Sequence, residues 1–257
     1  MLLCDLHANA YLINTLNMKR RAILLGHVDG QLSTNADLDK VCRFLCSSKG
    51  GAWEASEIIR SVNLSRKGLD VLLNATRVEG YDFVLFYFSG HGEYVRGTAL
   101  ELNPQGEEIN ESELSGLGAR QINIFDCCRK LPEKMIFKLA NSATIDSLAE
   151  SRDLKREACR KLYDMRNMAA APQFMSLYAC EINEYAHDFG YGGIYTNHLI
   201  NAANTFNGDF LLASEAHNMA INPTSYEAHV HGVVQTPDYF MAKLPSRSQI
   251  VLVVNPT

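Results

Sequence analysis

Residues 83–92 read FVLFYFSGHG, so that six strongly apolar residues run directly into Ser89-Gly90-His91-Gly92. A second apolar run, Ile122 to Phe125, leads in the same way into Asp126-Cys127-Cys128-Arg129. Short runs that are continuous rather than alternating, and rich in β-branched and aromatic residues, are typical of strands covered on both faces of a parallel sheet. The two runs therefore predict buried strands that end in a histidine between glycines and in a pair of cysteines.

Similar runs alternate with helical patterns along the rest of the chain. Further strands are expected at Ala22 to Leu25, Phe174 to Ala179 and Ile250 to Val254, and helices at roughly Leu38 to Leu45, Ser65 to Asn74, Tyr195 to Asn204 and Ser214 to Ile221. Thr34 with Asp37 predicts a cap at the start of the first helix. The turn at Asn103-Pro104-Gln105-Gly106 predicts a small hairpin after the histidine. Strands that alternate with helices predict an α/β sandwich with a largely parallel sheet.

Length and composition narrow the class of protein. The 257 residues favour one domain or at most two, and 47% apolar with 21% charged residues is the balance of a soluble globular protein. The net charge of −5 gives no electrostatic reason to expect nucleic acid. The apolar run at 83–88 is too short to span a bilayer, and the N-terminus is not a convincing signal peptide. Seven cysteines, an odd number, favour a reducing compartment. We therefore expect a cytoplasmic protein without membrane or nucleic-acid partners.

The residues that follow the two strands can do nucleophilic chemistry. Sites in open α/β sheets form at the carboxyl ends of the strands, where His91 could meet a cysteine thiol and hold its proton. Gly90 and Gly92 let the backbone turn tightly and leave N–H groups free to face a substrate oxygen. The alternative is that the histidine is structural and that the cysteines are small buried hydrophobes. Cys42 with Cys46 and His229 with His231 lack the CxxC spacing of a zinc site, so no metal site is predicted.

The two motifs resemble the catalytic core of the caspase-like cysteine peptidases, most closely the branch of prokaryotic caspase homologues and metacaspases. That branch carries its histidine in Ser-Gly-His-Gly and its nucleophile in Asp-x-Cys, which implies His91 and Cys128 as catalytic residues and Cys127 as the variable position. Further stretches resemble family landmarks in the same order: Arg21 to Gly26, Asn35 to Leu38, Leu177 to Cys180, Gly192 to Thr196 and Gln235 to Pro237.

The resemblance implies a fold and a division of the chain. The fold is a caspase-like α/β/α sandwich with a mostly parallel central sheet and a small hairpin after the catalytic histidine. Residues 1–20 form an N-terminal extension and residues 21–257 a peptidase domain, divided into a large-subunit-like part (21–129), a linker (130–171) and a small-subunit-like part (172–257). Ile250 to Val254 is expected to be either an exposed strand that pairs two molecules or a strand buried within one.

The resemblance also implies a mechanism and a specificity. Peptide bonds would be hydrolysed through a thioester on Cys128, with the N–H groups of Gly92 and Cys128 as the oxyanion hole. Asp126, where caspases carry Gln, implies cleavage after arginine or lysine, unless it caps backbone amides instead. The position at which metacaspases often carry a second aspartate is occupied by Ile182 here, so Glu181 and Glu184 are weaker substitutes.

The basic segment at 130–171 has two interpretations. It is either a solvated surface helix or a linker that the peptidase cuts during activation, with Lys155, Arg156, Arg160 and Lys161 as candidate self-cleavage sites. Some metacaspases require calcium, but no cluster of aspartates is visible, so no cofactor is predicted and a calcium requirement stays open.

The family resemblance further implies protein substrates, an upstream activating protease or sensor, and a stress, cell-death or anti-phage role. Two alternatives remain. One is a catalytically silent caspase-like scaffold. The other is a Cys-His hydrolase that acts on non-peptide acyl substrates.

Overall fold

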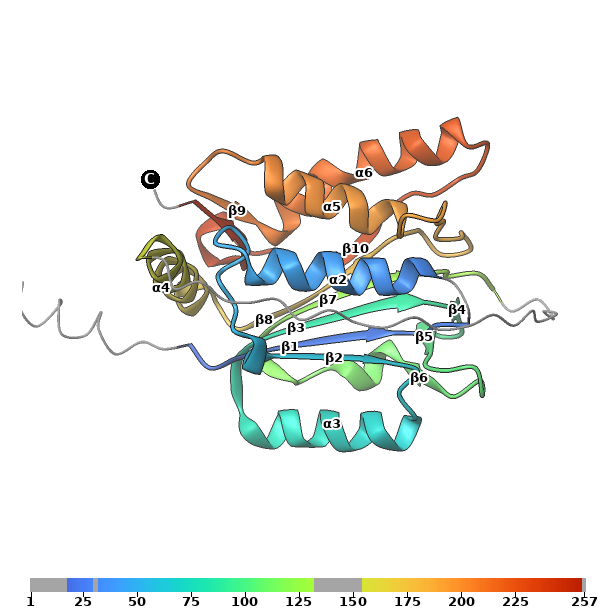
Figure 1. Cartoon of the computed structure of the whole chain (residues 1–257), viewed down its shortest axis with the longest axis horizontal. Coiled ribbons are helices and arrows are strands. Elements are labelled where there is room, and N and C mark those ends of the chain that lie inside the picture. Colours follow the sequence, from blue (N-terminus) through green and yellow to red (C-terminus); the bar gives the residue numbers. More distant parts are fainter. Residues whose placement is uncertain (1–17, 30–31, 132–153, 256–257) are drawn as a thin grey trace, which may run out of the picture.

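The central element of the fold is a six-stranded sheet with helices on both faces (Figure 1). The structure is a computed structural model, and it describes residues 18–29, 32–131 and 154–255. In spatial order the strands are β10 (Asp238–Met241), β8 (Gln173–Tyr178), β7 (Gly118–Cys127), β3 (Tyr81–Gly90), β1 (Arg20–Gly26) and β2 (Ile58–Val62). All neighbouring pairs are parallel except β10 with β8. The α/β sandwich with a mostly parallel sheet is thereby confirmed.

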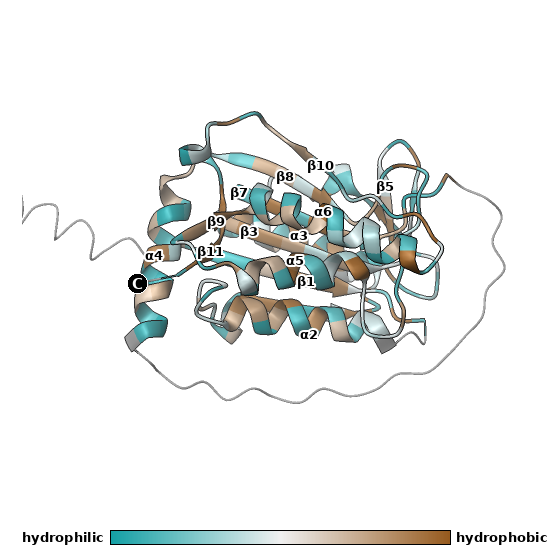
Figure 2. Ribbon diagram, turned by 90° about the horizontal axis from the view of Figure 1, so that it is seen from above, coloured by the Kyte–Doolittle hydropathy of each residue, from teal (hydrophilic) through white to brown (hydrophobic). Residues whose placement is uncertain are grey.

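The helices enclose one apolar core on each face of the sheet. On one face lie α2 (Leu32–Cys46), α5 (Ile194–Thr205) and α6 (Ala213–Val230), and on the other lies α3 (Arg66–Glu79) (Figure 1). Because side chains alternate along a strand, Leu85 and Tyr87 of β3 pack in the core under α2, whereas Phe86 and Phe88 pack in the core of the α3 face. Hydrophobic and hydrophilic residues alternate around α2, as expected for a helix with one buried face (Figure 2).

The starts and ends of these helices follow local chemistry. Ser65 caps α3, since its side chain accepts a hydrogen bond from the N–H of Gly68 at 3.1 Å. The predicted cap at Thr34 is wrong, because α2 already includes Leu32. The Thr34 hydroxyl instead donates to the carbonyl of His27 at 3.2 Å. No helix within the described ranges is long and apolar enough to cross a bilayer.

A small antiparallel sheet starts directly after His91. It consists of β4 (Gly92–Tyr94), β5 (Thr98–Glu101) and β6 (Glu108–Asn110), followed by the short 3₁₀ turn η2 (Glu111–Leu114). The predicted hairpin is therefore present and is extended by a third strand. The N–H of Glu101 donates to the carbonyl of His91 at 3.1 Å, which ties the backbone of the histidine to β5.

The C-terminal apolar run does not belong to the central sheet. Val251–Val254 forms β11, which pairs antiparallel with β9 (Phe210–Leu212) in a separate two-stranded sheet. The prediction that this run is a strand of the parallel sheet is thus wrong. The run is continuous because β11 is buried against α4 (Leu154–Ala169) and α6. The edge strands of the central sheet are β10 and β2.

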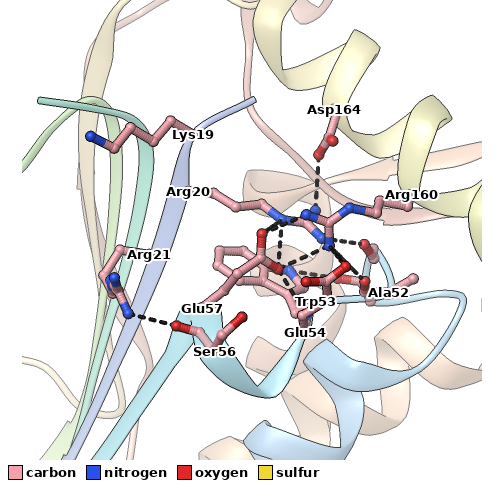
Figure 3. Close-up of polar contacts among 12 residues, drawn as sticks. Lys19, Arg20, Arg21, Ala52, Trp53, Glu54, Ser56, Glu57, Arg160 and Asp164 are labelled. Carbon is pink, nitrogen blue, oxygen red and sulfur yellow. Dashed lines mark hydrogen bonds and ion pairs between the residues drawn. The ribbon is translucent and has the colours of Figure 1, made fainter. Parts of the chain in front are cut away.

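Helix α4 is fixed at the end of the sheet where the parallel strands begin. Arg20, the first residue of β1, lies 2.9 Å from Asp164, and Arg160 lies 2.5 Å from Glu57 of the 3₁₀ turn η1 (Ala55–Glu57) (Figure 3). The guanidinium of Arg20 also lies 4.5 Å from the centre of the Trp53 ring. Of the predicted basic segment, residues 154–169 are helical, and a largely buried ion network holds this helix in place, whereas residues 132–153 lie outside the described residues. A last 3₁₀ turn, η3 (Ser246–Ser248), precedes β11.

Candidate active site

The pairing of β3 with β7 brings the predicted catalytic residues to the same edge of the sheet. Gly90 at the end of β3 pairs with Cys127 at the end of β7. Further along both chains, Glu93 forms an isolated bridge to Lys130 in the same register. His91 therefore lies opposite Cys128, on neighbouring strand ends that are about 4.8 Å apart in a sheet. The two residues follow the carboxyl ends of central strands, where sites of open α/β folds form.

The two adjacent cysteines differ in their surroundings. Cys127 is 1% exposed and packs in the core of the α3 face, where burial raises its pKa well above the usual value. Cys128 is partly exposed, and its thiol donates a hydrogen bond to the carbonyl of Ala186 at 3.7 Å. Burial also raises the pKa of Cys128, with a smaller contribution from the charge of Asp126. At neutral pH the Cys128 thiol is therefore protonated and requires a base before it can attack.

Gly92 allows the two strand ends to approach each other. A Cβ atom at this position would lie 2.9 Å from the sulfur of Cys127 and 3.0 Å from the carbonyl oxygen of Cys128. Neither neighbour is the flexible end of a long side chain, so only glycine fits. The backbone of Gly92 thus lies against that of Cys128, and these two residues carry the amides of the predicted oxyanion hole.

His91 is bonded to an aspartate that the sequence reasoning did not single out. The Nε2 atom of His91 lies 2.7 Å from Oδ2 of Asp29, which follows β1 at the same edge of the sheet. Within the described residues, no hydrogen bond joins the His91 ring to the Cys128 thiol. Catalytic hydrogen bonds are often loose without substrate, so the absence of this bond does not argue against His91 as the base.

Asp126 lies inside the fold rather than on an open surface. Its Oδ2 atom accepts hydrogen bonds from the backbone N–H and the hydroxyl of Thr196, at 3.0 and 2.6 Å, at the start of α5. This is the contact expected of the capping alternative. Both bonds end on Oδ2, and Oδ1 receives none from the described residues. Burial raises the pKa of Asp126 to about 6, and the nearby charge of Asp188 acts in the same direction.

A second buried carboxylate, Asp37 of α2, lies beside Asp126. It accepts the Ser89 hydroxyl at 2.9 Å and the N–H of Gly193 at 3.0 Å. Burial, together with the charge of Asp126, raises its pKa to about 7. Through these bonds Asp37 connects α2, the strand before His91 and the loop before α5. The sequence singled it out only as a helix-cap partner and as part of the family landmark at Asn35 to Leu38.

The loop at 181–193 carries the remaining acidic candidates. Glu181 is exposed, and Glu184 accepts the N–H of Thr236 at 2.7 Å, so its carboxylate holds the loop to the chain before β10. Asp188 is half-buried and accepts the N–H of Gly190 at 2.7 Å. Because its charge raises the pKa of Asp126, Asp188 is the acid of this loop that interacts with the residue predicted to select arginine or lysine. In the sequence, Asp188 stands out only as one more acidic residue after Ala179-Cys180.

The four candidate self-cleavage sites lie away from Cys128. They are Lys155, Arg156, Arg160 and Lys161, all in α4. Arg156 donates to the carbonyl of Trp53 at 2.7 Å, and Arg160 binds Glu57, whereas Lys161 pairs only with Glu157 on the surface. Helix α4 lies level with the start of β1. On β7, the residue in register with the start of β1 is Arg120. The stretch of strand from Arg120 to Cys128 is roughly 26 Å long.

No group of three or more His, Cys, Asp or Glu side chains in the described ranges is arranged to hold a metal ion.

The fold and these strand ends define a class of protein: an α/β sandwich with a histidine and a cysteine after adjacent central parallel strands. Comparison with family profiles places the chain within that class. Residues 19–244 match the profile of the caspase domain, and the chain therefore belongs to the caspase domain family of cysteine peptidases.

A solved structure with the same fold is that of caspase-1 from Spodoptera frugiperda. It superposes with a TM-score of 0.58 over 88% of each chain, at 13% sequence identity. No curated protein sequence matches the chain. The caspase-like fold expected from the sequence is thereby confirmed.

Proposed function

We propose that the protein is an endopeptidase that cleaves after arginine or lysine, with Cys128 as nucleophile and His91 as general base and acid. The observation that carries the proposal is the register between β3 and β7, which sets His91 opposite Cys128 while Cys127 faces the opposite core. The Cys128 sulfur would attack the scissile carbonyl as His91 takes the thiol proton. His91 would then protonate the leaving amine, and water would hydrolyse the thioester. The N–H groups of Gly92 and Cys128 would stabilise the oxyanion, each by about 3 to 4 kcal/mol.

Charge supports the preference for basic residues. Asp126 and Asp188 interact electrostatically at this edge of the sheet, and Asp37 adds a third carboxylate beside Asp126. A guanidinium would relieve their mutual repulsion through charge-assisted hydrogen bonds, whereas an aspartate side chain would increase it. Oδ1 of Asp126 and the half-buried Asp188 are the groups we assign to this contact. Glu181 and Glu184 are secondary candidates, since one is exposed and the other is bonded to Thr236.

The resting geometry supports an activation step. The Cys128 thiol is bonded to the carbonyl of Ala186, so it must turn away from that carbonyl before its proton can pass to His91. We propose that a cut in the predicted linker permits this. Because peptidases cut extended and accessible chain, the packed helix α4 is a poor site for this cut. An upstream protease or sensor would make the first cut.

The test compares the wild-type protein with Cys128→Ala and Cys127→Ala on fluorogenic peptides that end in Arg, Lys, Asp or Leu. Each is assayed with and without calcium, and self-cleavage is followed on a gel. We expect release after Arg or Lys that is lost in Cys128→Ala and largely kept in Cys127→Ala. Equal activity of Cys128→Ala and wild type would overturn the choice of nucleophile.

Two further arms address specificity and the alternatives. Asp188→Asn should raise KM for the arginine peptide, whereas Glu181→Gln should leave it unchanged. Activity on simple esters but on no peptide would identify a hydrolase of another substrate class. A chain cut between residues 132 and 153 that remains silent on every substrate would identify a scaffold. Family membership also motivates the proposal of a cytoplasmic role in stress, cell death or anti-phage defence.

A further inference from the structure

One of the two ring nitrogens of His91, Nε2, is hydrogen-bonded to a specific partner. Nε2 lies 2.7 Å from Oδ2 of Asp29, and both side chains are about one-third exposed or less. An imidazole has two nitrogens, so this bond leaves Nδ1 as the ring atom that can take the Cys128 proton. The carboxylate accepts a hydrogen from Nε2 and thereby fixes which tautomer the neutral ring adopts.

A buried second histidine packs against the ring of His91. His27 is 3% exposed, and its ring meets that of His91 edge to face, with the centroids 4.9 Å apart. Burial, together with the charge of His91, lowers the pKa of His27 to about 4, so His27 is neutral at physiological pH. A neutral ring packed edge-on restrains the plane of His91 without competing for the charge of Asp29.

The other ionisable groups near His91 do not replace Asp29. Glu101 of β5 has an oxygen 3.9 Å from Nδ1 of His27, too far for a hydrogen bond, and burial raises its pKa. Glu93 of β4 follows Gly92 and is only partly exposed. Neither of these glutamates has a hydrogen bond to the His91 ring among the residues that the structure describes. Asp29 is thus the carboxylate bonded directly to the predicted base.

We propose that Asp29 is the positioning residue of His91 and completes a Cys128–His91–Asp29 relay, an inference that rests on the proposed peptidase function. When the site closes on substrate, the S–H bond of Cys128 breaks as an N–H bond forms at Nδ1 of His91. The sulfur electron pair forms the bond to the scissile carbonyl carbon. Asp29 stabilises the resulting imidazolium through Nε2–H and keeps its own charge throughout. The scissile C–N bond then breaks as the Nδ1 proton passes to the leaving amine, and the acyl group remains on the Cys128 sulfur as a thioester.

The first arm of the test needs no substrate. Alkylation of Cys128 by iodoacetamide is followed from pH 5 to 9 by peptide mass spectrometry, which separates Cys128 from the other cysteines. The proteins compared are wild type, His91→Ala, Asp29→Asn, Asp29→Glu and the control Glu93→Gln. Loss of Asp29 removes the charge that favours the imidazolium, so Asp29→Asn should shift the midpoint of the alkylation profile and slow the reaction at neutral pH at least about tenfold. Asp29→Glu should restore part of the rate, and Glu93→Gln should match wild type.

The second arm measures kcat and KM on the arginine peptide, with folding checked by thermal unfolding. A positioning role predicts a fall in kcat for Asp29→Asn with little change in KM. A rise in KM alone, with an unchanged alkylation profile, would instead make Asp29 a substrate-binding residue and overturn the proposal. An alkylation profile that is insensitive to both His91→Ala and Asp29→Asn would also overturn it. If wild type cleaves no peptide, the proposed function fails, while the alkylation arm still decides the role of Asp29.

Discussion

At the scale of single residues, the site depends on a glycine that has no side chain as much as on the side chains of its neighbours. Gly92 follows His91 as the first residue of β4, and its α-carbon faces the chain at Cys127 and Cys128. A methyl group there would meet the carbonyl oxygens of Ala99 and Cys128 at 2.9 and 3.0 Å. These are backbone atoms of neighbouring strands, which cannot turn away as a side chain would.

We therefore expect Gly92→Ala to push the ends of β3 and β7 apart. The variant should lose most peptidase activity and about 1 to 3 kcal/mol of unfolding free energy, measured by urea denaturation. The control is Gly68→Ala, because the Cβ atom there meets the end of the Leu64 side chain and alanine is the better helix former. Gly68→Ala should be neutral or stabilising, and a Gly92→Ala protein with wild-type stability and activity would contradict the account.

The places of single residues in the fold also show what the sequence can predict. The positions of His91 and Cys128 at neighbouring strand ends were predicted because each follows a continuous apolar run, and such runs fix the ends of buried parallel strands. Asp29 was missed because it is 62 residues before His91 in the chain and meets it only through the pairing of β1 with β3. The side-chain alternation that sets Cys127 and Cys128 on opposite faces could have been anticipated, but the partner of Asp126 could not, because Thr196 belongs to a distant helix.

At the scale of elements, two polar clusters hold helices to the sheet. One is the buried pair Asp37 and Asp126, which connects α2, β3, β7 and α5. In an unfolded chain both carboxyls ionise near pH 4, whereas in the fold their pKa values are raised to about 7 and about 6. The folded state therefore binds more protons in this interval, and the contribution of the pair to stability falls as the pH rises from about 4 through about 7.

We expect Asp37→Asn to reduce this pH dependence. The amide oxygen can still accept from Ser89 and Gly193, but it carries no charge to repel Asp126. Urea midpoints of wild type and variant, measured from pH 5 to 8, should show wild type losing stability relative to the variant as the pH rises. A difference that is constant with pH, or that runs in the opposite direction, would show that Asp37 is not protonated in the fold.

The other cluster fixes α4. Arg160 is about one-quarter exposed and binds both oxygens of Glu57 and the carbonyl of Ala52, whereas the neighbouring Lys161 is 70% exposed and pairs only with Glu157. Arg160→Met should cost about 1 to 3 kcal/mol of unfolding free energy because it leaves the half-buried Glu57 with one partner fewer. Lys161→Met should cost less than about 0.5 kcal/mol. Urea denaturation of the two variants checks this, and equal losses would mean that the network does not hold the helix.

The two strands of the central sheet that the sequence reasoning missed share a physical cause. β2 reads IIRSV and is only partly buried, and β10 reads DYFM with Tyr239 and Phe240 exposed. Both are edge strands, which lack the continuous apolar run of a central strand. β11 has such a run for another reason, since burial between helices selects the same residues as burial in a parallel sheet.

At the scale of the whole molecule, the predicted linker connects β7 to β8, and these two strands are paired neighbours in the sheet. The chain from α4 onward is therefore held to the chain that ends with β7 by the β7–β8 strand pair, by the α4 network and by the contact between α2 and α5.

We expect a protein cut between residues 132 and 153 to remain one particle. With a protease site inserted in that segment, gel filtration of the cut protein should give the elution volume of the intact protein. Two bands should appear only on a denaturing gel. Separate elution of the two pieces would show that these contacts do not hold without the connecting chain.

The pairing of β7 with β8 across the cut also imposes an order in time. In the intact chain the connecting segment keeps the two halves at a high effective concentration, so the sheet closes in a unimolecular step. After a cut, the same pairing becomes a bimolecular association, which slows with dilution and competes with aggregation of the exposed strand edges. A cut would therefore have to follow folding for the two halves to be paired. A cut molecule that unfolds would not readily refold. Cleavage would therefore make the survival of the folded state depend on its unfolding rate rather than on its equilibrium free energy of unfolding.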